Sequence, residues 1–344
     1  MDLDKFLKEQ AGEVEGFMQV HLSAWNSWIE KNTKSLTPHS KAFLKASKGG
    51  KKIRGILIYL GYKLAGGEEK RDIYDISSAY EIFHTSILAH DDIIDQSPVR
   101  RGIPSLYKAL GGGHHGISGA ICLGDLGFFL STKIISESDF PSEVKIKALE
   151  HFSKTVMDTA LGEILDVELP FIKGERKEKD VILIMSLKTA KYTVSAPLQL
   201  GAILAGADEH LIRVLKEFGE NLGIAFQIQD DILGVFGEES ELGKSNKSDI
   251  EEGKNTLLII KALKNANSKQ LRVLKKYYGK GKISTKALLK VRKIFEDSKA
   301  LENSQKIALK YLSSAKKEIP GLTKDKDLSK ILEQISDYLV ERNK

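Results

Sequence analysis

Two aspartate-rich segments are the part of this sequence best suited to chemistry. The first runs from Asp91 to Asp95, reads DDIID, and lies in a segment whose apolar residues recur at helical spacing from about Asp72. Asp91 and Asp95 are one turn apart, so their carboxylates share a face and repel one another unless a cation neutralises them. Such oxygen ligands suit magnesium or manganese. A solvated acidic helix end is the alternative explanation for one such motif taken alone.

The second segment is the pair Asp230 and Asp231, which follows another stretch of helical periodicity. Gln227 precedes the pair by three and four residues, so its amide shares their face and can reach the same ligand. Two acidic clusters on separate apolar helices are hard to explain as surface decoration. If the clusters face one another across a helical bundle, they form a multi-metal site able to bind a diphosphate.

Basic residues occur where a diphosphate needs them. Lys51 and Arg54 follow two glycines and open a helical segment, so backbone N–H groups and the helix dipole add to their attraction for phosphate. Arg100 and Arg101 follow the first acidic motif, and arginine binds phosphate oxygens in a bidentate manner. Together with the aspartates they predict a cage of metal ions and cationic side chains.

Five further polar residues could each be either a ligand of the substrate or an ordinary structural residue. They are Lys188, Thr189, Lys244, Lys254 and His84. Single lysines in apolar helical segments are more often surface residues with buried stems than ligands. A histidine two turns before an acidic motif is equally well explained as a hydrogen-bonded core residue.

Composition and charge exclude several classes of protein. The single cysteine, Cys122, excludes an internal disulfide framework, and no secretory leader is recognisable, so we expect a cytoplasmic protein. No run of about 18 apolar residues occurs, since Asp125 interrupts the most apolar stretch, 120–130. We therefore expect no transmembrane segment. The net charge of +6 is a mild imbalance, too diffuse to predict a nucleic-acid partner.

Helical periodicity covers most of the chain, and strand signals are few, which predicts an all-α fold. Breaks rich in glycine, proline and small polar residues separate segments of about 10 to 30 residues, as in packed long helices. No composition shift marks a boundary. We expect one domain over 1–344, with the motifs in about 45–260 and lysine-rich amphipathic helices over about 265–344.

The ordered set of motifs resembles the trans-isoprenyl diphosphate synthase family, the polyprenyl synthetases, and within it the short-chain geranylgeranyl diphosphate synthases. The matching segments are, in chain order, Gly50-Lys51-Lys52-Ile53-Arg54, Glu81-Ile82-Phe83-His84, Asp91 to Asp95, Arg100-Arg101-Gly102, Gly124-Asp125, Lys188-Thr189 and Phe226 to Asp231. The resemblance implies an orthogonal bundle of antiparallel helices around a deep central cavity. Within this bundle the two acidic motifs are implied to face each other at the mouth of the cavity. The resemblance also implies a homodimer.

The resemblance further implies a reaction, in which isopentenyl diphosphate attacks the cation left when an allylic diphosphate ionises. The implied magnesium ligands are Asp91, Asp95 and Asp230, supported by Asp92 and Asp231, and with Lys188 these residues make up the implied catalytic set. The implied contacts of the allylic diphosphate are Arg100, Lys188, Thr189, Gln227, Lys254 and Lys244. The implied contacts of isopentenyl diphosphate are Lys51, Arg54, His84 and Arg101.

Two positions depart from the family pattern. Gly234 stands where many members have a third aspartate in the second motif, and Glu163 stands where a glutamine is common. Neither change removes an implied metal ligand. In the second motif, metal binding is therefore expected to depend on Asp230 and Asp231 alone.

Product length depends on the side chains one and two turns before Asp91, which the resemblance makes the floor of the chain-elongation cavity. Ser86 and Ile87 are not aromatic, which disfavours a farnesyl product, and Phe83 is expected to block the cavity one turn lower, near C20. Longer-chain and farnesyl synthases remain alternatives. So do a terpene cyclase, a noncatalytic subunit of a heteromeric synthase and a helical module that only binds metal or phosphate.

Overall fold

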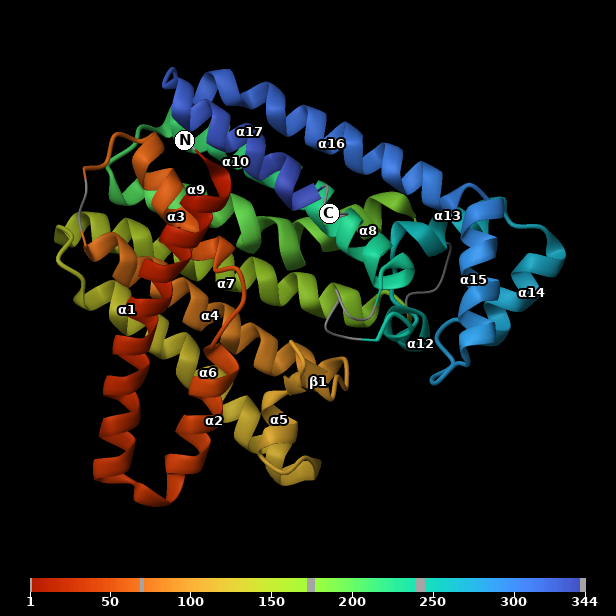
Figure 1. Ribbon diagram of the computed structural model, residues 1–344, viewed down its shortest axis with the longest axis horizontal. Coiled ribbons are helices and arrows are strands. Elements are labelled where there is room, and N and C mark those ends of the chain that lie inside the picture. The colour runs from red at the N-terminus through yellow and green to blue at the C-terminus, as the bar shows by residue number, and fades with distance from the viewer. Residues whose placement is uncertain (1, 69–70, 172–176, 239–244, 341–344) are drawn as a thin grey trace. The chain divides into compact units, whose positions relative to one another are not determined.

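The computed structural model describes residues 2–68, 71–171, 177–238 and 245–340 (Figure 1). Within these ranges the regular structure is helical apart from one two-stranded ribbon, which confirms the predicted all-α class. The chain divides into two compact units, Met1–Ser153 with Pro197–Arg213, and Lys154–Ala196 with Val214–Lys344. The single domain predicted for 1–344 stays a prediction.

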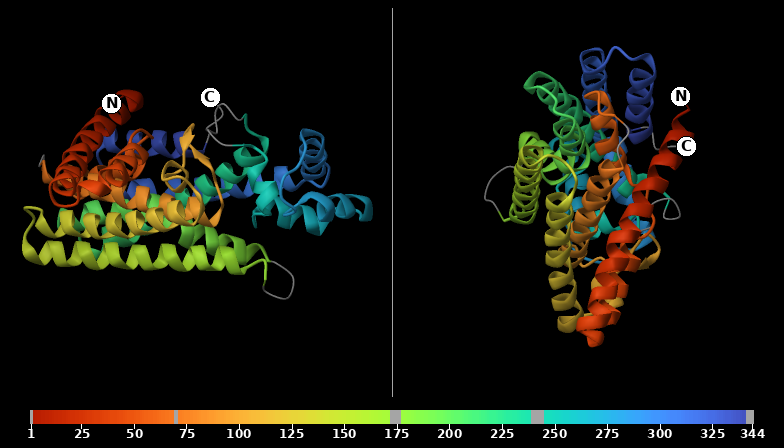
Figure 2. Two further views of the ribbon diagram at one scale, coloured as in Figure 1. Left: turned by 90° about the horizontal axis from the view of Figure 1, so that it is seen from below. Right: turned by 90° about the vertical axis from the view of Figure 1, so that its left-hand side faces the viewer.

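The first unit holds the first acidic motif. Its elements are α1 (Leu3–Asn32), η1 (Lys34–Leu36), α2 (Thr37–Ser47), α3 (Ile53–Leu64), α4 (Asp72–Ile94), β1 (Val99–Arg100), β2 (Ile103–Pro104), α5 (Leu106–Ala109) and α6 (Gly113–Glu137). The chain reverses through η1, so that α1 and α2 pack side by side (Figures 1 and 2). α4 packs against α1, α3 and α6, and most of its side chains are buried. Helices α7 (Ser142–Glu168), α9 (Ala196–Leu204) and α10 (Glu209–Phe236) contribute residues to both units.

The second unit holds the second acidic motif on α10. Its remaining elements are α8 (Glu178–Ile184), the π-helix η2 (Met185–Ser195), α12 (Ser248–Glu252), α13 (Leu257–Asn265), α14 (Ser268–Tyr277), α15 (Thr285–Asp297), α16 (Ala300–Leu322) and α17 (Lys326–Val340). A continuous apolar core joins α8, α10, α13 and α15, with fully buried residues such as Val291 and Phe295. α16 and α17 pack as an antiparallel pair (Figure 1).

Local sequence explains several element boundaries. α4 begins at Asp72 as predicted, with Asp72 and Asp75 in its first turn, where the helix dipole favours negative charge. α2 begins at Thr37, and Pro38 lies in its first turn, a position at which proline is tolerated. The β1–β2 ribbon and the π-helix η2 were not predicted from the sequence.

α6 has a more membrane-like composition than was expected from the sequence. Among the described helices it is the one with the length and apolar character of a membrane span, and 33% of that window is buried within the protein. It packs against α4 and α5, while Ile121, Leu126 and Phe129 are exposed. The helix therefore combines a buried side with an uncovered apolar side.

Candidate active site

The first acidic motif lies at the C-terminal end of α4. Asp91 and Asp92 are in its last turn and Asp95 is the C-cap residue, whose N–H donates to the Asp91 carbonyl at 2.8 Å. The helix dipole is negative at this end, so carboxylates here require compensation by positive charge. The motif is thus placed where bound cations are favoured.

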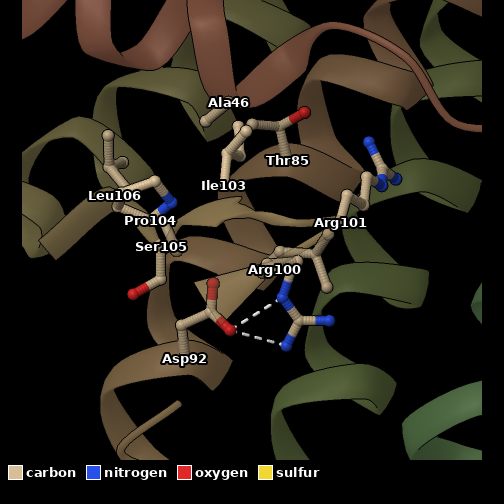
Figure 3. A pocket seen from close by; sticks show the side chains of 11 residues that line it. Ala46, Thr85, Asp92, Arg100, Arg101, Ile103, Pro104, Ser105 and Leu106 are labelled. Carbon is tan, nitrogen blue, oxygen red and sulfur yellow. Dashed lines mark hydrogen bonds and ion pairs between the residues drawn. The ribbon is translucent and has the colours of Figure 1, made fainter. Parts of the chain in front are cut away.

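Arg100 supplies part of that positive charge. Its Nη2 lies 2.8 Å from Asp91 Oδ2. The same Nη2 lies 2.7 Å from Asp92 Oδ1, and Nε donates to that Asp92 oxygen at 2.7 Å (Figure 3). Arg100 lies in β1, a few residues after the end of α4. Between the two elements the chain turns, and the Ser97 N–H donates to the Asp92 carbonyl. Arg100 thus contacts the first motif, and its role in binding a diphosphate stays a prediction.

Arg101 joins the β1–β2 turn to the glycine-rich loop before α3. Arg101 has φ of 52° and Gly102 has φ of 75°, which is the left-handed region that a tight turn requires. The Arg101 guanidinium donates to the Gly49 carbonyl at 3.4 Å, and a Cβ placed on Gly50 would lie 2.9 Å from Arg101 Cζ. A side chain at position 50 would therefore push Arg101 away. Two of the predicted basic motifs meet here.

Carboxylates from Glu15 and Glu81 hold the start of α3. Lys52 is 5% exposed with φ of 50°, and its Nζ pairs with Glu15 Oε2 at 2.7 Å. Gly55 N–H donates to Glu81 Oε1 at 3.0 Å. Lys51 is exposed beside them. The pairing of Lys52 with Glu15 was not predicted, because nothing in the sequence pairs residues so far apart.

His84 lies in the same region as the arginines. It is 7% exposed, and burial lowers its pKa well below the ordinary value, with further lowering by the positive charges of Arg54, Arg101, Arg100 and Lys52. His84 is therefore neutral at neutral pH. The predicted group of Arg54, His84 and Arg101 gathers in the first unit.

Burial also changes the ionisation of Asp92. It raises the pKa of Asp92 to about 6, against the lowering effect of the Arg100 charge and hydrogen bond. Asp92, Arg100 and Arg101 line a small cavity of about 30 Å³ together with Thr85 and Ile103 (Figure 3). This cavity is large enough only for water, so the ligand itself must occupy more open space around it.

The second acidic motif lines a pocket of about 100 Å³ in the second unit. The polar residues around this pocket are Asp166, Lys188, Thr189, Gln227, Asp230, Asp231, Asp249, Lys254, Asn255 and Thr256. Gln227 Nε2 donates to Asp231 Oδ1 at 2.7 Å, which confirms that the two residues share a face. Four carboxylates and two ammonium groups give the lining a net negative charge. A diphosphate is repelled by that charge unless cations accompany it.

Lys188 is held by two carboxylates of α7. Its Nζ lies 2.8 Å from Asp166 Oδ2, and 2.9 Å and 3.1 Å from the two Glu163 oxygens. The π-helix carries Lys188 against α7 so closely that a Cβ on Gly162 would lie 2.3 Å from Lys188 N. Glu163, one of the two departures from the family pattern, is thus a direct partner of a predicted substrate-binding residue.

Asp249 explains the other departure, at Gly234. A Cβ on Gly234 would lie 2.2 Å from Asp249 Oδ2, so the carboxylate of Asp249 fills the space that a side chain at 234 needs. Asp249 is 3% exposed, and Lys254 Nζ lies 3.9 Å from its Oδ1. Asp249 was not predicted as a site residue. Its position in the chain between the second motif and Lys254, a predicted diphosphate contact, was the signal that could have found it.

The carboxylates of this pocket repel one another. Burial raises the pKa of Asp231 well above its ordinary value, and the nearby charges of Asp249 and Asp230 raise it further, while Gln227 and Lys254 oppose the change. Buried carboxylates of this kind are stabilised in their ionised form by a cation. Lys244 lies outside the described residues.

The three residues predicted as the floor of the cavity lie on α4 in the first unit. Phe83 is fully buried, with ring centroids 5.3 Å from Tyr80, 5.7 Å from Phe128 and 5.0 Å from Phe152. Ser86 is fully buried against α6, since a Cβ on Gly127 would lie 1.9 Å from its Oγ. Ile87 is half-buried.

Comparison with known proteins gives the class. The polyprenyl synthetase family model matches residues 39–296. The chain is 33% identical over 299 residues to the geranylgeranyl diphosphate synthase of Sulfolobus acidocaldarius, covering 86% of this chain and 88% of that one. It therefore belongs to the polyprenyl synthetase family and is a prenyltransferase.

Two further relatives add detail. The chain is 32% identical over 306 residues to the geranylfarnesyl diphosphate synthase of Aeropyrum pernix, covering 86% of this chain and 91% of that one. Its fold is similar to the crystal structure of a geranylgeranyl pyrophosphate synthase from Corynebacterium glutamicum complexed with isoprenyl diphosphate and magnesium. That match has a TM-score of 0.92, with 25% identity and full coverage of both chains. The family resemblance and the reaction class inferred from the motifs are confirmed.

Proposed function

We propose that this protein is a geranylgeranyl diphosphate synthase, which joins an allylic diphosphate to isopentenyl diphosphate head to tail and releases diphosphate. The observation that carries the proposal is the pairing of each acidic motif with cationic side chains in the same cluster. Arg100 contacts Asp91 and Asp92, and Lys254 lies beside Asp249 and the second motif. Carboxylates and cations interleaved in this way suit a ligand that brings both phosphate charge and metal ions.

Magnesium fits this donor set. No three Asp, Glu, His or Cys side chains in the described ranges already form a metal site. Magnesium usually keeps several waters and is held by one or two carboxylates together with substrate phosphates, so an open donor set is appropriate. Asp91, Asp95 and Asp230 would hold it, supported by Asp92 and Asp231. When bound, it stabilises the negative charge that develops on the departing diphosphate. Manganese suits the same oxygens.

The protein's own residues have two tasks in this proposal. The first is to hold the allylic diphosphate, through Arg100, Lys188, Lys254, Thr189 and Gln227. The second is to hold isopentenyl diphosphate, through Lys51, Arg54, His84 and Arg101. Neutral His84 donates or accepts a hydrogen bond without adding charge. Ionisation of the allylic substrate leaves a cation, the double bond of isopentenyl diphosphate attacks it, and the released diphosphate takes the proton. No protein nucleophile is required.

The proposed product length rests on the aromatic cluster around Phe83. We take this cluster, which lies one turn below the small and fully buried Ser86, as the floor that stops elongation. A product near C20 follows. A longer product is the second candidate for this protein, because one relative is a geranylfarnesyl diphosphate synthase. Retention of both acidic motifs argues against a noncatalytic subunit, and the basic residues beside the first motif argue against a terpene cyclase.

The uncovered side of α6 supports a homodimer. Ile121, Cys122, Leu126 and Phe129 recur at helical spacing and are exposed, Phe129 at 74%. An apolar helix face of this kind is stable in water when a second copy covers it. A homodimer in the cytoplasm also agrees with a free, exposed thiol at Cys122. One domain over 1–344 completes the proposal.

Product analysis tests the proposal. Purified protein with magnesium is incubated with isopentenyl diphosphate and each of the C5, C10 and C15 allylic primers, and the dephosphorylated products are sized. We expect a C20 product and a loss of turnover by orders of magnitude in Asp230→Ala. Asp4→Ala, an exposed aspartate of α1, is the control and should keep wild-type turnover. An Asp230→Ala variant within about threefold of wild type would remove the basis for the metal assignment.

The floor residue has its own test. Phe83→Ala removes the centre of the aromatic cluster and should lengthen the product beyond C20, as measured by chromatography of dephosphorylated products. Phe295→Ala removes an equally buried ring from the core of the second unit and should lower stability without changing product length. Unchanged product length in Phe83→Ala would show that another residue is the floor.

A further inference from the structure

The positive charge of this protein is concentrated in one segment. Of its 53 lysine and arginine residues, 13 lie between Gly253 and Phe295, where there is no aspartate or glutamate. The rest of the chain has 40 basic and 47 acidic residues. The net charge of +6 is therefore the sum of a strongly basic segment and a mildly acidic remainder. The expectation of a diffuse charge is wrong for this segment.

The structure places these charges on the outer sides of a helical hairpin. The nine lysine and arginine residues from Lys264 to Lys290 are all exposed, and we call them the basic surface. They belong to the end of α13, to α14 and α15, which pack on one another, and to the loop between those two helices (Figure 1). The opposite sides, including Leu274, Leu288 and Val291, are buried in the core of the second unit.

The basic surface differs from the other cations of the segment. Lys254 pairs with Glu252, Lys261 with Glu178, and Lys293 with Asp297. In the described part of the chain, no residue of the basic surface has an acidic partner. A solvated helix face normally mixes both signs of charge, and concentrating one sign raises the potential that an anionic partner experiences.

Apolar side chains are interspersed with these charges. Leu289 is 56% exposed and stands between Lys286 and Lys290 on the outer side of α15. Leu263 is 40% exposed at the end of α13, next to Lys264. Lysines together with exposed leucines on amphipathic helices are the features that bind a helix to the interface of an anionic bilayer.

We propose that the basic surface is a peripheral docking site for anionic phospholipid membranes. Lysine-rich clusters attract a negatively charged lipid surface through many small contributions, with no need for a defined pocket. The two exposed leucines add apolar contact at the level of the headgroups. The proposal concerns attachment to a membrane surface, and it does not depend on the reaction that the protein catalyses.

Nucleic acid is the other polyanion of this charge density, and the side chains disfavour it. Only Arg272 among the nine residues is an arginine, although arginine provides the bidentate contacts by which proteins usually bind phosphate backbones. Tyr277 and Tyr278 are half-buried, and the Tyr278 hydroxyl donates to the Lys254 carbonyl at 2.5 Å. No exposed aromatic ring is therefore present among the described residues of the hairpin to stack on bases.

Membrane attachment also suits the proposed product. If the protein makes a C20 diphosphate, the apolar chain of that product partitions into lipid. An enzyme held at the membrane surface releases it where a lipid-embedded enzyme that uses prenyl chains can take it up. This consequence rests on the proposed function, whereas membrane binding itself does not.

Vesicle binding tests the proposal. Full-length protein is sedimented with sucrose-loaded vesicles of phosphatidylcholine alone, or with about one third phosphatidylglycerol. We expect binding to the anionic vesicles only, and its loss at high salt as charges are screened. The variant Lys275→Gln, Lys276→Gln, Lys286→Gln, Lys290→Gln should bind the anionic vesicles on the order of 100-fold more weakly. Its turnover in detergent-free solution should match wild type.

A matched variant controls for net charge alone. Lys310, Lys317, Lys324 and Lys330 are exposed on α16, on α17 and in the loop between them. Changing these four to glutamine removes the same charge from the same unit and should leave vesicle binding within about threefold of wild type. Circular dichroism confirms that both variants fold.

Three outcomes would overturn the proposal. The first is failure of wild type to bind anionic vesicles, or equal binding to neutral ones. The second is equal loss of binding in the hairpin variant and the matched variant. The third is that transfer RNA displaces the protein from anionic vesicles when the concentration of RNA phosphate is lower than that of anionic lipid. This result would make nucleic acid the preferred partner. A protein that makes prenyl diphosphates but fails these tests would keep its proposed function and lose only the membrane site.

Discussion

Restoring the common aspartate at position 234 should damage this protein. Many members of the family have a third aspartate where this chain has Gly234, so Gly234→Asp converts the second motif to the usual pattern. In the structure the Asp249 carboxylate already occupies the space, because a Cβ on Gly234 would lie 2.2 Å from Asp249 Oδ2. Asp249 is 3% exposed and shares its pocket with Asp166, Asp230 and Asp231, so displacing its carboxylate is unfavourable.

The effect of Gly234→Asp on the free energy of unfolding has three contributions. Overpacking a buried site costs about 1–3 kcal/mol. Replacing a helical glycine gains about 1 kcal/mol, which offsets part of that cost. A further carboxylate about 4 Å from Asp249 adds at most about 4 kcal/mol of repulsion at an effective dielectric constant of 20. We therefore expect Gly234→Asp to lower the free energy of unfolding of metal-free protein by about 2–5 kcal/mol. Gly234→Ala should lose less, because it adds no charge.

Urea unfolding of metal-free protein measures these differences, and steady-state turnover with magnesium measures the effect on the site. The double variant Gly234→Asp, Asp249→Ala exchanges the carboxylate between the two positions and should recover more than half of the lost stability. Gly12→Ala is the control, because Gly12 is helical with no atom within 4 Å of its added Cβ. If Gly234→Asp were as stable and active as wild type, Asp249 would not occupy this space in the working enzyme.

Two more predictions concern His84 and Lys188. Because the pKa of His84 is well below its ordinary value in the folded protein, the unfolded chain alone binds the proton as pH falls through about 6.5. As the pH is lowered below that value, the free energy of unfolding should therefore decrease by at most about 1.4 kcal/mol per pH unit. His84→Gln should remove this contribution, which is measured as a smaller difference between the free energies of urea unfolding at pH 5 and pH 7. Glu163→Gln removes one of the two carboxylates that compete with diphosphate for Lys188, so the KM for the allylic substrate should fall about threefold to tenfold while the KM for isopentenyl diphosphate is unchanged. A higher allylic KM would show instead that Glu163 holds Lys188 in its productive position.

Features that depend on short separations along the chain could be predicted from the sequence. Helical periodicity predicted the all-α class, and the same periodicity placed Gln227 and Asp231 on one face, where they share a hydrogen bond of 2.7 Å. α4 begins at Asp72, where its apolar pattern predicted. These features follow from backbone geometry within one helix, which a local pattern is sufficient to describe. The order of motifs along the chain indicated the family in the same way.

Features that join distant residues are visible only in the folded protein. The fold places the Asp249 carboxylate beside Gly234, brings Lys188 to Glu163 of α7, and pairs Lys52 with Glu15 of α1. Such contacts depend on how helices pack, and side-chain packing has no periodic signature in the sequence. The same is true of the basic surface, since composition shows the absence of acidic residues but only the fold shows which sides of the helices are exposed. The local motifs of the sequence therefore determine which residue types are available for chemistry. Packing between helices determines which other residues contact them and shift their charge and position.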